Sequence, residues 1–368
     1  MKKDKVVYFL GAGASAHALP VLDKLREEIL ETGRSLNSYF ANDTNLPSFL
    51  KTLEQAKDDL VTDLNWLVHE SRNHQTIDTL AKKYFLIKDT TSLWRLKRTL
   101  ITYFHIAQLF IRAGSLFKRD LTLDKRYDSL IATIAENNER SEVQLNPRYG
   151  IVSWNYDIQF ELSLRQYVKE PINKIKKEFQ IHPVKGQLDL ENYNCDIQQF
   201  AMFKLNGNAL WDSKLGIINE PIPSEVDTIL MESDKYRAME AVLKYYSNKE
   251  IDDQWYFQFS WEDGSVGLQH SSNSQMIEDA KQLISRAQTL IIVGYSFPAF
   301  NRHLDKELLS VFSGNKIIIQ DANPQLIEDN LKDLSSVFAG PFHNENPKKY
   351  FVHDPVNIEE GAKYFPFN

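Results

Sequence analysis

The sequence contains a single cysteine, Cys195, among its 368 residues. One thiol can form neither an internal disulfide nor a Cys-x-x-Cys redox pair, and it cannot supply a four-cysteine zinc site. The histidines show no metal-binding spacing such as HExxH. Secreted disulfide scaffolds and zinc ribbons are therefore excluded, and we predict no metal site.

Long hydrophobic runs are also missing. The N-terminal run Val6–Leu10 is too short for the core of a signal peptide and far too short to cross a bilayer. The longest apolar stretch, residues 100–117, carries polar residues such as Gln108 and Arg112, which favours a buried amphipathic helix. We therefore expect a cytoplasmic protein that does not associate with membranes.

The sequence has no excess of positive charge. Lys and Arg total 43 against 50 Asp and Glu, so the net charge is −7. This balance provides no general attraction to nucleic acid or to an anionic membrane. Two local basic clusters are explained more simply as solvated helix faces, so direct nucleic-acid binding is not predicted. Their members are Arg95, Lys97, Arg98, Arg112, Lys118 and Arg119 in the first, and Lys169, Lys174, Lys176 and Lys177 in the second.

The remaining composition, 42% hydrophobic and 25% charged residues, is typical of a globular protein. Short apolar segments rich in β-branched residues alternate with amphipathic segments, which predicts an α/β fold with a Rossmann-like doubly wound parallel sheet. The expected strands are Val6–Leu10, Tyr149–Ser153, Ala201–Leu205, Thr289–Val293 and Lys316–Gln320. The expected helices are Leu22–Leu30, Ile158–Tyr167, Gln275–Arg286, His303–Phe312 and Gln325–Leu334.

A large helical insertion interrupts this predicted sheet. Leucine and aromatic residues at helical spacing indicate a helical subdomain over residues 37–146. The Rossmann-like core is then expected over residues 1–36 and 147–340, with irregular insertions at about 168–200 and 212–270. Residues 341–368 predict a C-terminal tail that packs irregularly on the surface.

A glycine-rich turn follows the first predicted strand. Gly11 and Gly13 allow the backbone to turn sharply and to approach a diphosphate, and Ser15 can cap the next helix or bond a phosphate oxygen. A tight strand–helix turn without a ligand also explains these residues. The dinucleotide fingerprint of dehydrogenases requires a second strand ending in Asp or Glu about 20 residues later. Here the chain stays helical, so an ordinary dehydrogenase is disfavoured.

Polar turns follow the other predicted strands as well. Asn155 offers both a donor and an acceptor, which suits ribose hydroxyls or a water molecule, although helix capping by Asn155 or Asp157 is an equally simple explanation. Open α/β sheets bind ligands beyond the carboxyl ends of their strands. The turns together therefore predict one nucleotide-binding crevice. They are Ser153–Asp157, Lys204–Asn208, Gly294–Pro298 and Asp321–Pro324.

In this order, the motifs GAGAS, SWNYD, KLNG, VGYSFP and DANP resemble those of sirtuin-like domains, especially the bacterial antiphage-defence branch. The resemblance covers residues 6–20, 149–162, 201–211 and 289–324. It implies that NAD+ binds in the crevice and is hydrolysed at the nicotinamide–ribose bond. Such a site must stabilise an oxocarbenium-like ribose and direct a water molecule at C1′.

The resemblance also implies roles for individual residues. Asn155 would position the water or the ribose hydroxyls, Asp157 would lie at the nicotinamide-ribose end, and Asn206 occupies the position of the family's catalytic histidine. These three are the candidate catalytic residues. The candidate NAD+-binding residues are Gly11, Ala12, Gly13, Ala14, Ser15, Asn155, Gly294, Ser296 and Asn323.

The sequence departs from the family in two ways. Deacetylase sirtuins carry a four-cysteine zinc module, so we expect neither zinc nor protein deacetylation here. Asn206 replaces a histidine base, and a carboxamide cannot provide general-base assistance, which contributes about 10²–10⁴-fold. Another group replaces the base, or NAD+ is bound without fast turnover, or the asparagine was introduced. The nearest histidines are His17, His182 and His303, each explained more simply as a surface or structural residue.

The leading hypothesis is a sirtuin-like NAD+ hydrolase that depletes NAD+ in antiphage defence and is regulated by homo-oligomerisation or a partner. One family arrangement implies a HerA-type ATPase as that partner. The alternative is a catalytically weak NAD+- or ADP-ribose-binding assembly module, which Asn206 suggests. A second alternative, a nuclease component, depends only on the basic clusters and lacks an identifiable set of metal-binding carboxylates.

Overall fold

The computed structural model describes residues 5–42, 46–109, 123–170, 172–183, 193–209, 232–247, 257, 259, 261–262, 271–335 and 350–355. Much of the predicted insertions at 168–200 and 212–270, and most of the predicted tail at 341–368, lie outside these residues. The described residues include the turns that follow each predicted strand.

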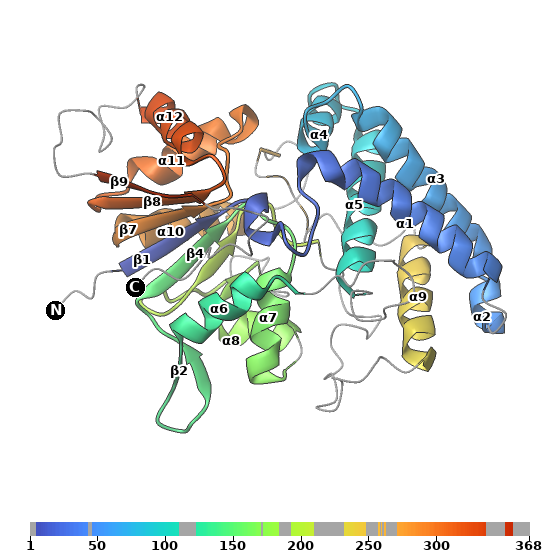
Figure 1. The fold of residues 1–368 in the computed structure, drawn as a ribbon, viewed down its shortest axis with the longest axis horizontal. Helices are drawn as coiled ribbons and strands as arrows, with labels where there is room; N and C mark the ends of the chain where they lie inside the picture. Colours follow the sequence, from blue (N-terminus) through green and yellow to red (C-terminus); the bar gives the residue numbers. More distant parts are fainter. Residues whose placement is uncertain are drawn as a thin grey trace.

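A parallel sheet forms the core, with strands in the order β5-β6-β4-β1-β7-β8-β9 (Figure 1). The central strand β1 (Lys5–Leu10) is buried along its whole length and separates the two halves of the sheet. This order confirms the predicted Rossmann-like α/β fold. The strands on one side are β4 (Tyr149–Ser153), β6 (Met202–Lys204) and β5 (Ile181–His182), and those on the other are β7 (Ala287–Val293), β8 (Lys316–Asp321) and β9 (Tyr350–Pro355).

Helices cover both faces of the sheet, which explains the continuous apolar character of the strands. On one face, Tyr8 of β1 packs in a cluster with residues of α6 (Lys125–Ile134) and α7 (Gln159–Val168). On the other, Phe9 packs in a cluster with residues of α10 (Ser271–Ser285), α11 (Arg302–Ser310) and α12 (Pro324–Ser335). Because successive side chains of β1 point to opposite faces of the sheet, this one strand contributes to the hydrophobic cores on both faces.

The registers place the carboxyl ends of the central strands level with one another. Leu10 at the end of β1 lies opposite Ser153 of β4 and Val293 of β7. Ser153 in turn lies opposite Lys204, the last residue of β6. The turns that follow these four strands consequently begin at the same edge of the sheet.

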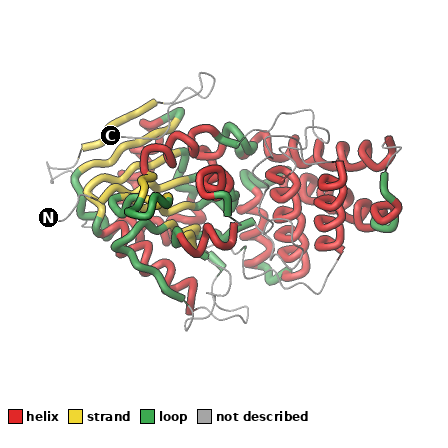
Figure 2. The backbone as a smooth tube through the Cα atoms, turned by 90° about the horizontal axis from the view of Figure 1, so that it is seen from below, coloured by secondary structure: helices red, strands yellow, loops and turns green. Residues whose placement is uncertain are grey.

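A separate layer of helices lies beyond this carboxyl edge (Figures 1 and 2). We call it the helical layer. Apolar residues such as Leu60, Leu100 and Val242 form its core, and Ala18 and Leu19 from the chain after β1 join that core. Its members are α1 (Leu22–Asn42), α2 (Ser48–Lys51), α3 (Glu54–Ser71), α4 (Ile77–Leu86), α5 (Thr90–Leu109) and α9 (Glu232–Ser247).

The division between the two units differs from the predicted one. Helix α1 packs on α3 and α5 although its residues 22–36 were assigned to the core, and α9 comes from a segment predicted to be irregular. Helix α6 was assigned to the helical subdomain but packs on the sheet. Helical periodicity identifies an apolar face without identifying the surface that the face will cover, so sequence spacing could not decide these three assignments.

Each expected strand and helix is present. Most boundaries shift by a few residues, but the helix expected over Leu22–Leu30 continues to Asn42. The sequence did not predict α8 (Ile172–Glu178), the two-residue strand β5, or the hairpin β2 (Ala135–Asn137) and β3 (Val143–Leu145). Part of the tail that was predicted to be irregular is a strand, because β9 pairs in parallel with β8 from Lys316↔Tyr350 to Asp321↔Pro355. Within the described part of the chain, no helix combines the length and the apolar character needed to cross a bilayer.

Candidate functional site

The turns after β1 and β7 pack directly against each other through their glycines. The Gly11 N–H donates to the Val293 carbonyl, and the Gly13 N–H donates to the Gly294 carbonyl, both at 3.0 Å. A Cβ on Gly13 would lie 2.6 Å from the Gly294 Cα atom, and Gly294 has a φ of +57°. These glycines therefore serve a backbone-to-backbone contact, which explains their presence without a ligand.

We expect Gly294→Ala to lower the free energy of unfolding by about 2–4 kcal/mol, because it adds left-handed strain to overpacking against Gly13. Urea unfolding followed by circular dichroism measures this change. Gly33→Ala is the control. Gly33 lies inside α1, and a Cβ added there would lie 3.7 Å from Val61 Cγ1 of α3, which is an ordinary contact distance. That variant should gain about 0.5–1 kcal/mol. Equal free energies of unfolding for the two variants would contradict the conclusion that Gly294 packs too closely against Gly13 to accept a side chain.

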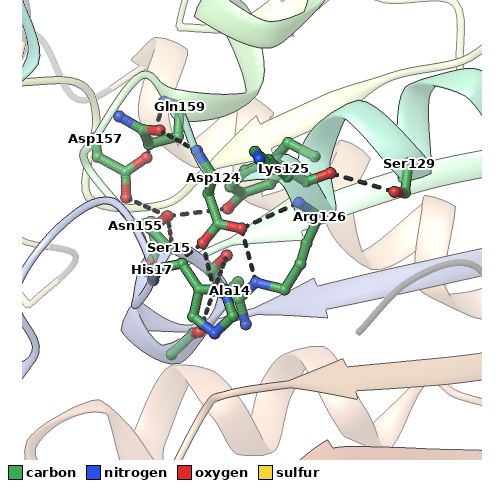
Figure 3. A network of polar contacts seen from close by, with 12 residues as sticks. Ala14, Ser15, His17, Asp124, Lys125, Arg126, Ser129, Asn155, Asp157 and Gln159 are labelled. Carbon is green, nitrogen blue, oxygen red and sulfur yellow. Dashed lines mark hydrogen bonds and ion pairs between the residues drawn. The ribbon is translucent and has the colours of Figure 1, made fainter. Parts of the chain in front are cut away.

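Ser15 joins the first turn to the turn after β4 (Figure 3). It ends the short 3-10 helix η1 (Ala12–Ser15), and its hydroxyl donates to Asp157 Oδ2 at 2.9 Å instead of capping a helix. Asn155 Nδ2 lies 3.4 Å from the same hydroxyl oxygen, and the Tyr127 hydroxyl lies 3.1 Å from it. We call Ser15, Asn155 and Asp157 the Ser15 cluster. All three are buried.

The Asp157 carboxyl is held from several directions. Burial raises its pKa, and the charge of Lys204, the Gln159 N–H and the Ser15 hydroxyl oppose that rise. Asp157 Oδ1 accepts the Gln159 N–H at 3.0 Å. Beneath it, Lys204 Nζ donates to the Asp157 carbonyl and, at 2.9 Å, to Glu161 Oε1. The turn after β4 is therefore tied to β6 and α7 through a buried ion pair.

Asn206 lies at the same edge but has a different partner. Its Nδ2 donates to the Trp154 carbonyl at 2.9 Å. The Trp154 ring stacks on Tyr295 of the β7 turn, with centroids 5.6 Å apart and planes at 9°. The Tyr295 hydroxyl donates to Asp305 Oδ2 at 2.9 Å. The turns after β1, β4, β6 and β7 thus contact one another at one edge of the sheet.

Three of the other proposed NAD+-binding residues, Ala12, Ser296 and Asn323, lie nearer the surface. Ala12 and Ser296 are exposed, and the Ser296 carbonyl accepts from Asn330 Nδ2 at 3.0 Å. Asn323 is also exposed, and its Oδ1 accepts the Leu326 N–H at 3.3 Å in the first turn of α12. Helix capping accounts for Asn323 without a ligand. Gly11 and Ala14 are buried in the first turn.

None of the three histidines takes up the position expected of the missing base. The ring of His303 is 91% exposed and lies 3.1 Å from Glu307. His182 is buried on the outer strand β5 against Phe203, and burial lowers its pKa to about 4. His17 is exposed beside the first turn, where its backbone N–H donates to Asp124 Oδ2 at 3.1 Å.

Helix α6 supplies contacts to the site that the sequence did not reveal. Arg126 Nη2 donates to the carbonyls of Gly13 and Ala14, each at 3.3 Å, and Arg126 pairs with Asp124 (Figure 3). Tyr127 reaches Ser15 from the next position of the helix. More than 100 residues separate α6 from the first turn, and no local pattern marks such a contact.

Several buried polar atoms near this edge have no hydrogen-bond partner. They include both amide atoms of Asn208, Gln159 Nε2 and Asn301 Oδ1. Buried polar groups are rarely left unpaired, so these atoms keep hydrogen-bonding capacity that no described protein group uses. Across the part of the chain that the structure describes, no group of three His, Cys, Asp or Glu residues is arranged to hold a metal ion.

Comparison with known proteins adds no assignment to this geometry. No protein-family model matches the chain, and no curated protein matches its sequence.

Proposed function

We propose that this chain binds NAD+ beyond the carboxyl edge of its sheet and hydrolyses the nicotinamide–ribose bond. The observation that carries the proposal is the Ser15 cluster, where the turns after β1 and β4 meet through Ser15, Asn155 and Asp157. The chain continues from β1 to β4 on one side and reaches β7 on the other. Doubly wound sheets bind nucleotides at such a switch point.

The residues of the site suit the charges that this reaction develops. The nicotinamide of NAD+ leaves as a neutral molecule while positive charge moves to the ribose. A carboxylate at Asp157 offsets that charge, and the Ser15 hydroxyl and the Gln159 N–H orient it. Asn155 positions a ribose hydroxyl or the attacking water through its carboxamide.

The biological setting is part of the same proposal. Unrestrained NAD+ hydrolysis would harm the cell, so we propose that activity is regulated by homo-oligomerisation or by a HerA-type ATPase partner during antiphage defence in the cytoplasm. The nuclease alternative loses support because three of its basic residues pair with acids, in Arg95–Asp63, Lys97–Glu262 and Lys174–Glu170, while Arg112, Lys118 and Arg119 lie outside the described residues.

A second function, NAD+ or ADP-ribose binding without fast turnover, is favoured by Asn206. Its Nδ2 is committed to the Trp154 carbonyl, and the carboxamide has no titratable proton acceptor. Hydrolysis therefore requires another base, whereas binding does not.

We expect the purified chain to bind NAD+ in calorimetry and to release nicotinamide, measured by chromatography. Asn206→His should increase that release by about tenfold or more, because it adds a base worth up to about 10²–10⁴-fold. Asn206→Ala is the matched control, since it removes the bond to Trp154 without adding a base. Binding without release from wild type or Asn206→His would favour the binding module. Absence of NAD+ binding would refute both functions.

A further inference from the structure

The side chain of Tyr127 connects α6 to the Ser15 cluster. Its hydroxyl lies 3.1 Å from Ser15 Oγ, and both residues are 2% exposed. The Tyr127 ring packs edge-on against Phe160 of α7, with centroids 6.1 Å apart and planes at 80°. An aromatic side chain has few rotatable bonds, so a ring that is held by its packing directs its hydroxyl to one place. Helix α6 therefore presents a fixed hydroxyl to Ser15.

The hydrogen atoms around Ser15 Oγ can be assigned from its partners. A serine hydroxyl donates a single hydrogen and accepts through its lone pairs. That hydrogen goes to Asp157 Oδ2 at 2.9 Å, so Ser15 Oγ can only accept from its other partners (Figure 3). Asn155 Nδ2, a donor, lies 3.4 Å away. The Tyr127 hydroxyl must then be a donor as well, and the hydrogen bonds run in one direction, from Tyr127 to Ser15 to Asp157.

This direction favours the charged form of the Asp157 carboxyl. Its two oxygens accept hydrogen bonds, Oδ2 from Ser15 and Oδ1 from the Gln159 N–H at 3.0 Å. Burial raises the pKa of Asp157, and the Ser15 bond opposes that rise. A donor behind Ser15 polarises its hydroxyl and strengthens its bond to the carboxylate. Removal of the Tyr127 hydroxyl should therefore raise the pKa of Asp157 further.

The charged groups around Asp157 are unchanged when only the Tyr127 hydroxyl is removed. Lys204 of β6 favours the charged carboxyl, and Glu161 of α7 opposes it. These two side chains pair with each other at 2.9 Å. The other titratable groups near the cluster, on the β4 turn, α8 and α6, are Tyr156, Lys176, Asp124 and Arg126. A change in the pKa of Asp157 in a Tyr127 variant is therefore attributable to the hydroxyl.

We propose that Tyr127 is a positioning residue of the hydrolysis: its hydroxyl fixes the direction of the Ser15 hydroxyl and so keeps the Asp157 carboxyl charged and oriented toward the ribose. The inference rests on the proposed function, in which that carboxylate offsets the charge that develops on the ribose. Tyr127 acts through Ser15, so it is not itself a catalytic residue. The fold brings it there from 112 residues along the chain.

Tyr127→Phe removes the hydroxyl and keeps the ring against Phe160. We expect nicotinamide release from wild type to rise with pH as Asp157 loses its proton, and this rise should lie at higher pH in Tyr127→Phe. On the acid side of the rise, release should be about tenfold slower than in wild type, a smaller loss than the about 10²–10³-fold expected for a group that contacts the reacting atoms. On the alkaline side the two rates should converge, and the affinity for NAD+ should change little.

Tyr167→Phe is the matched control. The Tyr167 hydroxyl donates to Asp128 Oδ1 at 2.6 Å, a bond that also joins α7 to α6 but includes no member of the Ser15 cluster. This variant loses the same atom from the same pair of helices, so it should keep the wild-type pH profile. An unmoved profile in Tyr127→Phe, or an equal movement in Tyr167→Phe, would overturn the inference.

A double substitution tests whether Tyr127 acts through Ser15. Ser15→Ala alone should also move the rise to higher pH. Adding Tyr127→Phe to Ser15→Ala should cause no further movement, because residues of one hydrogen-bond network have coupled effects. Additive movements would contradict the path through Ser15. A loss of rate that is uniform across pH and accompanied by a lower melting temperature would show that Tyr127 only supports the fold.

NMR titration of isotope-labelled aspartate carboxyls measures the same effect without NAD+. The Asp157 signal is the one missing from Asp157→Asn. Its titration midpoint should lie at higher pH in Tyr127→Phe than in wild type, and an unchanged midpoint would overturn the inference even if the chain cleaves NAD+. If the midpoint moves but wild type neither binds nor cleaves NAD+, the proposed function fails and the positioning role fails with it.

Discussion

Lys204→Met is expected to lower the free energy of unfolding by about 3–5 kcal/mol. The Lys204 and Glu161 side chains are 1% and 0% exposed, and Lys204 Nζ lies 2.9 Å from Glu161 Oε1. Glu161 Oε2 already has no hydrogen-bond partner. Removal of the Lys204 ammonium would leave the buried Glu161 carboxylate without the cation that it contacts directly. Breaking one half of a buried pair is costly for this reason, whether or not the intact pair is stabilising.

Urea unfolding of Lys204→Met and Lys176→Met tests this expectation. Lys176 is equally buried and near Glu161, and burial lowers its pKa to about 7. Part of its population is therefore already neutral at pH 7, so Lys176→Met should lose less stability. Equal losses, or a loss under about 1 kcal/mol for Lys204→Met, would contradict the role assigned to the pair.

The ion pair also connects stability to the site. Lys204 donates to the Asp157 carbonyl as well as to Glu161, so it holds the turn that presents the Asp157 carboxyl to Ser15. Lys204→Met should therefore weaken the Ser15 cluster even in the fraction of molecules that remains folded.

Asn155→Ala is expected to reduce nicotinamide release by about 10²–10³-fold, the range for loss of one preorganised polar group in an active site. Asn155 is 7% exposed, and its Nδ2 lies 3.4 Å from the Ser15 hydroxyl oxygen. The substitution removes the carboxamide that would orient the water or the ribose. It leaves the backbone N–H, which donates to Ser153 Oγ at 3.0 Å, in place.

Asn138→Ala is the matched control for Asn155→Ala. Asn138 lies in the exposed β2–β3 turn, where its Oδ1 accepts from the backbone N–H groups of Arg140 and Glu142. Its loss should disturb that turn without affecting turnover. If Asn155→Ala changes only the affinity for NAD+ and the rate is unaltered, Asn155 has no part in the chemistry.

The sequence predicted the sheet well because its strands are short apolar runs followed by polar turns. Val6–Leu10 and Lys316–Gln320 are short and largely apolar, a pattern typical of parallel strands that are buried on both faces of a sheet. It predicted the convergence of the turns for a related reason, since parallel strands present all their carboxyl ends at one edge. The strands β5 and β9 escaped prediction because one has two residues and the other ends in His-Asp-Pro, which resembles an irregular edge.

By itself, the sequence determined the Rossmann-like fold, the turns that form the site, the absence of a histidine at position 206 and the lack of cysteines for zinc. Each of these follows from local pattern or from composition. Only the tertiary structure decided that Gly13 and Gly294 fill each other's space and that Arg126 and Tyr127 support the first turn. The reason is physical. Such contacts join residues far apart in the chain, and they are selected by how whole helices pack at the sheet's carboxyl edge.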